Sequence, residues 1–375
     1  MAWGPGAIEQ LSGLGAHRAL VVVDPNLARS ERQRRIVEEL QKTDTVVEVT
    51  SEVTVEPTLA SLEPGLARAR GHRPDWIVAV GGGSTIDTAK GIWIRYARPE
   101  VALDAVTPLV DLSLRTVARF VAIPTTCGSG SDATWVAHLR EEDGRILDVG
   151  ARELMPDWSL LDPTLTDSLP PTTVAEGGGD LLARALESIA SEWTNLFSHA
   201  LAVEAVGLAI SSLPAAVRPP GDPEARERLH QASTLAGLAS ANSQLGVVHA
   251  LAHAISSVVH VPYARLTSTL LPYGIEFNFP AARERYMGLG PVIGPASVQN
   301  RSALTERLRS LWGTVGLPTT LPRAGVPADL LTARRAEIVE RARRSPALVS
   351  NPRLPSVDEL GRLLDTAAQG GAVGF

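Results

Sequence analysis

Three consecutive glycines, Gly81, Gly82 and Gly83, have the sequence context of a phosphate-binding turn. They follow the apolar run Trp76–Val80, which predicts a buried strand, and they lead through Ser84 into a helix-like stretch. A glycine backbone can approach an anion closely, and the free N–H groups at the start of a helix attract negative charge. Ser84 is expected both to cap this helix and to donate to the phosphate. The alternative is a tight turn that binds nothing, but the strand–turn–helix context favours binding.

A second polar stretch, residues 123–131, is rich in hydroxyls and small residues and could line the same cleft. Taken alone, the stretch is equally consistent with a structural polar loop. The three glycines do not have the spacing of the dinucleotide fingerprint. The two stretches therefore predict a phosphate ligand without fixing the reaction.

The elements around these stretches change in type near Asp167. Before it, short apolar runs alternate with helical patterns, which predicts a parallel sheet covered on both faces. Strands are expected at 19–23, 46–49 and 76–80, and helices at 30–40 and 58–70. Later helices are expected at 174–189, 196–212, 224–241, 247–259, 302–315, 327–344 and 356–369. The predicted fold is a Rossmann-like α/β domain (residues 1–167) followed by an all-helical domain (residues 168–375).

Composition excludes several classes of protein. The 375 residues are 44% hydrophobic and 20% charged, which suits two globular domains. The net charge of −6 argues against a nucleic-acid binder. Cys127 is the only cysteine, so neither an intramolecular disulfide nor a cysteine-based zinc site can form. No stretch predicts a membrane span and the N-terminus lacks a signal-peptide pattern, so the expected location is cytoplasmic.

Four segments together resemble the iron-dependent alcohol dehydrogenases, a group within the dehydroquinate-synthase-like superfamily. They match motifs of that family in the correct order: Gly81–Lys90, Ile123–Ser131, Leu161–Pro163 with Ser168–Pro171, and His249–Pro262. The likeness begins near Trp3, where residues 3–8 look like the family's first hairpin. It extends to at least Asn278 and is looser beyond Phe279.

The resemblance implies a nicotinamide cofactor in the first domain. The positions that match the family's cofactor contacts are Gly81, Gly82, Gly83, Ser84, Asp87, Lys90, Thr125 and Thr126. Asp24 ends a strand where family members place an acidic residue against the adenosine ribose. A carboxylate there binds ribose hydroxyls and repels a 2′-phosphate, so NAD is expected rather than NADP. The alternative is that Asp24 only begins the Asp-Pro-Asn turn.

The resemblance also implies a metal site, which this sequence does not complete. Asp180 and His249 match two of the family's four ligand positions, whereas Arg184 and Tyr263 occupy the other two. An arginine has no lone pair to give, and a neutral phenol is a poor ligand. We therefore expect no metal. A shifted site using His249 and His253 is an alternative, because histidines at this i, i+4 spacing bind zinc elsewhere.

Hydride transfer without a metal needs another group to stabilise the alkoxide and one to accept its proton. We expect Arg184 to supply the charge and His253 or Tyr263 to relay the proton, beside Asp180 and His249. The planar guanidinium also suggests a substrate carboxylate. The alternative is an ordinary Asp180–Arg184 ion pair that closes a dead pocket.

Several functions follow from these expectations. The first is a metal-independent dehydrogenase or ketone reductase acting on a small-molecule or peptide hydroxy or oxo acid, for which maleylacetate reductases are a superfamily precedent. A narrower form is oxidative decarboxylation of a β-hydroxy acid, such as a peptide C-terminal threonine in natural-product biosynthesis. The alternatives are a non-catalytic partner subunit and a lyase or cyclase. Family likeness further implies a homo-oligomer.

Overall fold

The computed structural model describes residues 1–374, which divide into two compact units. The α/β unit comprises Met1–Thr126 and Gly130–Ser168. The helical unit comprises Cys127–Ser129 and residues from Leu169 onward. The first unit thus extends one residue past Asp167, the end of the predicted domain, and part of the 123–131 stretch packs with the helices.

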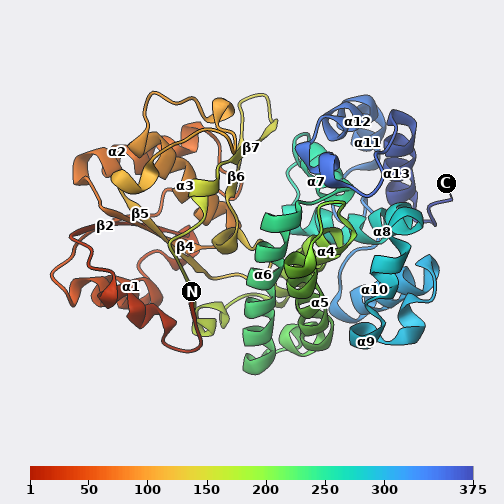
Figure 1. Cartoon of the computed structure of the whole chain (residues 1–375), viewed down its shortest axis with the longest axis horizontal. Coiled ribbons are helices and arrows are strands. Elements are labelled where there is room, and N and C mark those ends of the chain that lie inside the picture. Colours follow the sequence, from red (N-terminus) through yellow and green to blue (C-terminus); the bar gives the residue numbers. More distant parts are fainter. Residues whose placement is uncertain (375) are drawn as a thin grey trace. The chain divides into compact units, whose positions relative to one another are not determined.

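The α/β unit is built on a six-stranded sheet in the order β1-β8-β5-β4-β2-β3. Figure 1 labels β2, β4 and β5 of this sheet. Every neighbouring pair is parallel. This confirms the predicted parallel sheet. The strands are β1 (Ala2–Trp3), β2 (Arg18–Val23), β3 (Val46–Thr50), β4 (Trp76–Gly81), β5 (Arg119–Pro124) and β8 (Trp158–Leu161).

Both faces of this sheet are buried, which explains why its central strands read as continuous apolar runs. On one face, side chains such as Ile77 and Phe120 pack against α2 (Glu63–His72) and α3 (Gly83–Ala97). On the other face, side chains such as Val78 pack against α1 (Glu31–Gln41). The sheet is therefore wound on both sides, with α3 leaving the end of its central strand β4.

One prediction about this unit is wrong, and one pair of strands was not predicted. Residues 3–8 form no hairpin, because Trp3 ends the short strand β1, which pairs in parallel with β8. The only antiparallel pair among the described residues is β6 (Val136–Arg140) with β7 (Ile146–Gly150), which the sequence analysis did not predict. Their charged turn is five residues long, so the two strands pair locally.

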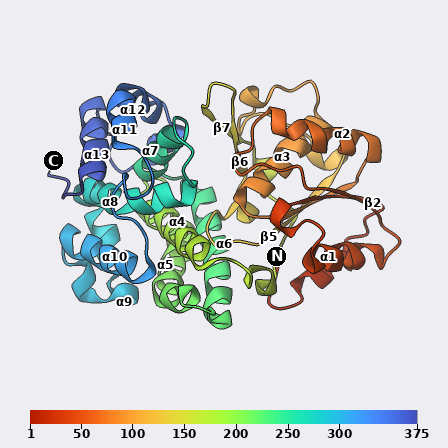
Figure 2. The ribbon, with the colours of Figure 1, turned by 180° about the vertical axis from the view of Figure 1, so that it is seen from behind.

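The second unit is helical, as predicted (Figure 2). Its central helix is α4, which packs against α5, α6 and α8. The helices are α4 (Pro171–Ala190), α5 (Leu196–Val217), α6 (Pro223–Ser243), α7 (Val247–Ser256), α8 (Tyr263–Met287), α9 (Gly290–Ile293), α10 (Arg301–Val315), α11 (Ala328–Ala333), α12 (Arg335–Arg343) and α13 (Val357–Gln369).

The helices differ from the sequence expectations at two places: one predicted helix is divided, and one helix, α8, was not predicted. The predicted helix 327–344 is divided into α11 and α12. The long helix α8 contains Pro272 and Pro280, whose helix-breaking tendency hides it in the sequence. It is kinked at Ala282, where the backbone leaves the helical region.

Helix α5 is the one described helix that is long and apolar enough to cross a membrane by length and composition. Length and composition alone are weak evidence of a span, because core helices share both features. It packs against α4, α6 and α10. In its most apolar window 44% of the residues are buried. Helix α5 therefore packs within the helical unit along the buried part of its surface.

Candidate active site

The turn between β4 and α3 has the geometry of an anion-binding turn. Gly82 is the N-cap of α3 and offers no side chain to cap it, so the first N–H groups of the helix lack an intrahelical partner. A Cβ on Gly81 would overlap the Thr85 side chain, and one on Gly82 would lie 3.2 Å from Thr126. The turn therefore requires glycine, and the helix beyond it presents unbonded donors, as an anion needs.

The two predicted threonines lie beside this turn. In the sheet register Gly81 is opposite Pro124, and the Thr125 amide donates to the Gly81 carbonyl at 3.0 Å. Thr126 approaches Gly82 as described above. Both threonines thus meet the glycine turn at the carboxyl edge of neighbouring parallel strands, where α/β sheets bind ligands.

Three predicted cofactor residues have structural roles within the α/β unit. Ser84 is not the helix cap, because α3 begins at Gly83, and its hydroxyl donates to the Val55 carbonyl. Asp87 is buried and accepts from the His138 amide at 3.1 Å. Lys90 is fully buried, and its Nζ donates to the carbonyls of Ser131, Thr134 and Val136 at 2.7–3.0 Å. We therefore correct the assignment of Lys90, whose ammonium holds the 131–136 segment and has no proton left for a cofactor.

Asp24 is at the end of β2, as the ribose-binding prediction requires, but it also forms the predicted turn. Its Oδ1 accepts from the backbone and side-chain amides of Asn26 at 2.8 and 3.0 Å. This is an Asx turn, so one carboxylate oxygen is engaged in local structure. The carboxylate nevertheless places a negative charge at the strand end.

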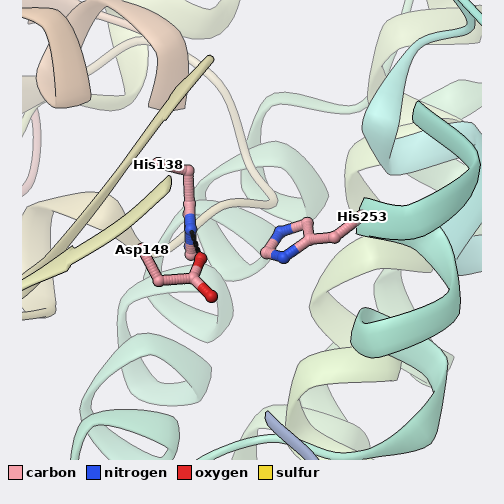
Figure 3. A group of neighbouring side chains, drawn as sticks. All are labelled: His138, Asp148 and His253. Atoms are coloured by element: carbon pink, nitrogen blue, oxygen red, sulfur yellow. Dashed lines mark hydrogen bonds and ion pairs between the residues drawn. The ribbon is translucent and has the colours of Figure 1, made fainter. Parts of the chain in front are cut away.

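The β6–β7 hairpin contributes a His–Asp pair that sequence analysis missed. His138 on β6 faces Asp148 on β7, and His138 Nδ1 lies 2.7 Å from Asp148 Oδ1. Figure 3 shows both side chains projecting from the hairpin. His253, which is also labelled there, belongs to α7 of the helical unit and is described with that unit. This pair depends on the register between β6 and β7, which the sequence pattern alone does not reveal.

Three buried polar side chains form a stripe along one face of α4. Asp180, Arg184 and Glu187 recur at the i, i+4, i+7 spacing that aligns residues on a helix. Their exposures are 3%, 6% and 3%. Buried charges at this spacing need partners from the neighbouring helices.

The partners of Asp180 come from α7 and α8. Asp180 Oδ1 accepts from the Thr267 hydroxyl at 2.7 Å, and it lies 3.9 Å from His249 Nε2. Among the described residues, no carboxylate lies within 4.0 Å of Arg184, so the Asp180–Arg184 ion pair that was the alternative interpretation is absent. The Arg184 guanidinium donates a long hydrogen bond of 3.5 Å to the Ser240 hydroxyl. The buried Nε of Arg184 has no hydrogen-bond partner in residues 1–374.

Glu187 is a member of this cluster that the sequence analysis did not identify. Its carboxylate accepts from the Gly246 amide at 2.9 Å, the Val248 amide at 2.6 Å and His249 Nδ1 at 2.6 Å. Burial raises the pKa of Glu187 to about 7, although hydrogen bonds from the backbone amides of Val248, Gly246 and His249 and the charge of Arg184 act in the opposite direction. Its position seven residues after Asp180 is the sequence signal that could have found it.

The three predicted aromatic residues lie together at the start of α8 and along α7. The Tyr263 ring centroid is 4.8 Å from that of His253 and 6.1 Å from that of His249. His249 and His253 are one turn apart on α7. The helical unit thus brings together all five predicted catalytic residues, from three different helices.

The four family ligand positions do not fit a metal ion. Arg184 brings a positive charge to the position of a donor, and the neutral phenol of Tyr263 is a poor ligand. Asp180 and His249 remain, and two donors are too few for a tight divalent site. Within the described part of the helical unit, no three His, Cys, Asp or Glu side chains place their ligand atoms within 4.8 Å of one another. The donor set therefore disagrees with metal binding at these positions.

Comparison with known proteins accounts for both units. The model of the iron-containing alcohol dehydrogenases matches residues 2–163, and that of the C-terminal domain of the same family matches residues 174–368. The chain is similar to the NADPH-dependent butanol dehydrogenase of Clostridium saccharobutylicum, with 31% identity over 100% of this chain and 97% of the relative.

Two further similarities define how far the likeness extends. The bifunctional aldehyde-alcohol dehydrogenase of Escherichia coli is 31% identical over 96% of this chain, but the match spans only 44% of that larger protein. The iron-containing alcohol dehydrogenase structure from Thermococcus thioreducens is 28% identical, with a TM-score of 0.90 over 99% of this chain and 98% of the other. The likeness therefore covers both units of the chain.

Proposed function

The chain belongs to the iron-containing alcohol dehydrogenase family, and we propose that within this family it works without a metal ion, using the Arg184 guanidinium instead. It is accordingly an oxidoreductase that acts on CH–OH groups with a nicotinamide cofactor. The proposal concerns its metal independence, its substrate and the roles of individual residues.

The cofactor is proposed to bind with its pyrophosphate at the glycine turn before α3. Unbonded helix N–H groups and the glycine backbone support this position. We favour NAD over NADP because the carboxylate of Asp24 would repel a 2′-phosphate. The butanol dehydrogenase relative is named for NADPH, so this preference rests on Asp24 and not on that relative.

One observation carries the proposal: Arg184 is a buried guanidinium without a carboxylate partner. Its exposure is 6%, and no acidic side chain in residues 1–374 lies within 4.0 Å of it. A buried unpaired charge is costly, so proteins keep one where a ligand or a reaction uses it. A substrate carboxylate or a developing alkoxide would supply the missing negative charge.

In the oxidation direction, a bound nicotinamide would accept the hydride of the carbinol carbon, and the hydroxyl proton would pass to a base. The products are a carbonyl compound, the reduced cofactor and one proton. Arg184 stabilises the negative oxygen as the proton leaves. His253 and Tyr263, whose rings are adjacent, provide the route for the proton.

The proposed substrates are hydroxy or oxo acids, because a guanidinium binds carboxylates with two parallel hydrogen bonds. A β-hydroxy acid would become a β-keto acid, whose loss of carbon dioxide is driven by the new carbonyl and needs no metal. A peptide with a C-terminal threonine is one such substrate. A maleylacetate-reductase-like reaction uses the same groups, whereas the glycine turn argues against a non-catalytic partner subunit.

The test combines metal analysis with substitution of Arg184. We expect protein purified without chelators to contain far less than one iron or zinc per chain and to oxidise hydroxy acids with NAD. Arg184→Ala should reduce turnover by about 100-fold or more, as loss of an oxyanion donor does. Arg283→Ala, on the exposed surface of α8, is the matched control. Stoichiometric metal, or unchanged turnover in Arg184→Ala, would overturn the proposal.

A further inference from the structure

The start of α7 is held by a side chain from α4 instead of by its own cap. Gly246 is the N-cap of α7 and has no side chain to cap it. Glu187 accepts from the Gly246 and Val248 amides, and Asn351 accepts from the Val247 amide between them at 3.0 Å. A carboxylate at a helix N-terminus also interacts favourably with the helix dipole.

This arrangement leaves no room for a side chain at Gly246. A Cβ there would lie 2.5 Å from Asn351 Oδ1 and 2.9 Å from Glu187 Oε1. Asn351 is itself fixed by a reciprocal amide pair with Asn278, with bonds of 2.9 and 3.0 Å. The position of the Glu187 carboxylate is thus fixed by backbone amides, independently of its contact with the His249 ring.

The same carboxylate determines how His249 is turned. Glu187 Oε2 lies 2.6 Å from His249 Nδ1, and the opposite ring nitrogen, Nε2, lies 3.9 Å from Asp180 Oδ1. When Glu187 is ionised it can only accept, so Nδ1 carries the proton, and in the neutral ring Nε2 then carries the lone pair. Both ring nitrogens lie in a site that is 1–3% exposed, so bulk water cannot reset the tautomer.

We propose that Glu187 is a positioning residue, which fixes the orientation and tautomer of His249 and the start of α7. Through α7 it also places His253, one turn beyond His249, against Tyr263. Carboxylates orient catalytic and metal-binding histidines in this manner in other proteins. The catalytic part of this inference rests on the proposed function, whereas the tautomer does not.

The tautomer can be measured directly by NMR of protein labelled with ¹⁵N at its eight histidines. The ring nitrogens of His249 are assigned by their loss in His249→Asn. At pH 8 we expect the wild-type protein to have a protonated Nδ1 and an unprotonated Nε2. Finding the proton on Nε2 would overturn the proposal, whether or not any variant folds.

Glu187→Gln then tests whether the carboxylate is the cause. Its amide N–H, turned toward Nδ1, would favour the other tautomer, so we expect the ¹⁵N pattern to invert or become mixed. With the best substrate from a panel of hydroxy acids and simple alcohols, we expect kcat to fall about 10- to 100-fold while the affinity for NADH is unchanged. Glu192→Gln is the control, since Glu192 is exposed just beyond the end of α4.

The outcomes separate the two proposals. If Glu187→Gln keeps the wild-type tautomer and kcat, the positioning role is refuted. If the tautomer changes but Arg184→Ala remains fully active, the proposed function fails and Glu187 still orients His249. A loss of NADH binding in Glu187→Gln would instead indicate general structural damage and would also refute the specific role.

Discussion

Arg184 allows a prediction in which stability and activity change in opposite directions. In the protein without ligands, the guanidinium is 6% exposed, its Nε is unpartnered within the described chain, and its hydrogen bond to Ser240 is long. Arg184→Met keeps much of the apolar stem and removes the charge. The lost hydrogen bond is worth about 1 kcal/mol, whereas the effective desolvation cost of a buried ion is several kcal/mol.

The variant without ligands should therefore be more stable than the wild type by about 1–3 kcal/mol. The attraction between Arg184 and an ionised Glu187 stabilises the wild type and so reduces this gain in stability. The largest gain is therefore expected where Glu187 is protonated. For a unit of about 200 residues the shift in melting temperature is roughly 2–4 °C per kcal/mol. Turnover should fall by about 100- to 1,000-fold, because the oxyanion loses its charged donor.

Urea unfolding of the protein without ligands, together with steady-state kinetics, measures both quantities. The control is again Arg283→Ala, for which we expect changes within about 0.5 kcal/mol and wild-type turnover. If Arg184→Met is destabilised by more than about 1 kcal/mol, the guanidinium is satisfied in the free protein and the reasoning from its unpaired charge is wrong.

Three further predictions follow from the other buried groups. Gly81→Ala should abolish NADH binding, measured by fluorescence, because its Cβ would overlap Thr85 and displace the turn; retained affinity would exclude this turn as the phosphate site. Lys90→Met should lower the unfolding free energy by about 3 kcal/mol or more in urea, because three carbonyls lose their donor; an unchanged midpoint would contradict its structural role. The pKa of Glu187 is raised from 4.5 to about 7 in the folded protein. Between these pH values the folded protein therefore binds more protons than the unfolded chain. The free energy of unfolding should accordingly fall by up to about 3 kcal/mol as pH rises from 4.5 to 7. Comparing Glu187→Gln with the wild type isolates this contribution, and parallel stability–pH curves for the two proteins would refute it.

The sequence by itself determined the fold class and the glycine turn between β4 and α3. Strands buried on both faces read as apolar runs such as Trp76–Val80, and a glycine turn between a strand and a helix has a local signature. The change to helical periodicity after Pro170 likewise depends only on neighbouring residues. The sequence also shows that Arg184 and Tyr263 stand at two of the family's ligand positions, because the type of each side chain is known without the fold.

Only the tertiary structure decided which polar groups are partnered and by what. Lys90 follows a glycine turn that suggests a ligand, yet its ammonium holds three carbonyls from residues 131–136. Asp180 and Arg184 have the spacing of an ion pair, but Thr267 of α8 holds the aspartate and the guanidinium is left without a carboxylate within 4.0 Å in the described residues. Partnerships of this kind join residues far apart in the chain. The packing of the helices determines these contacts, and local sequence patterns do not predict that packing.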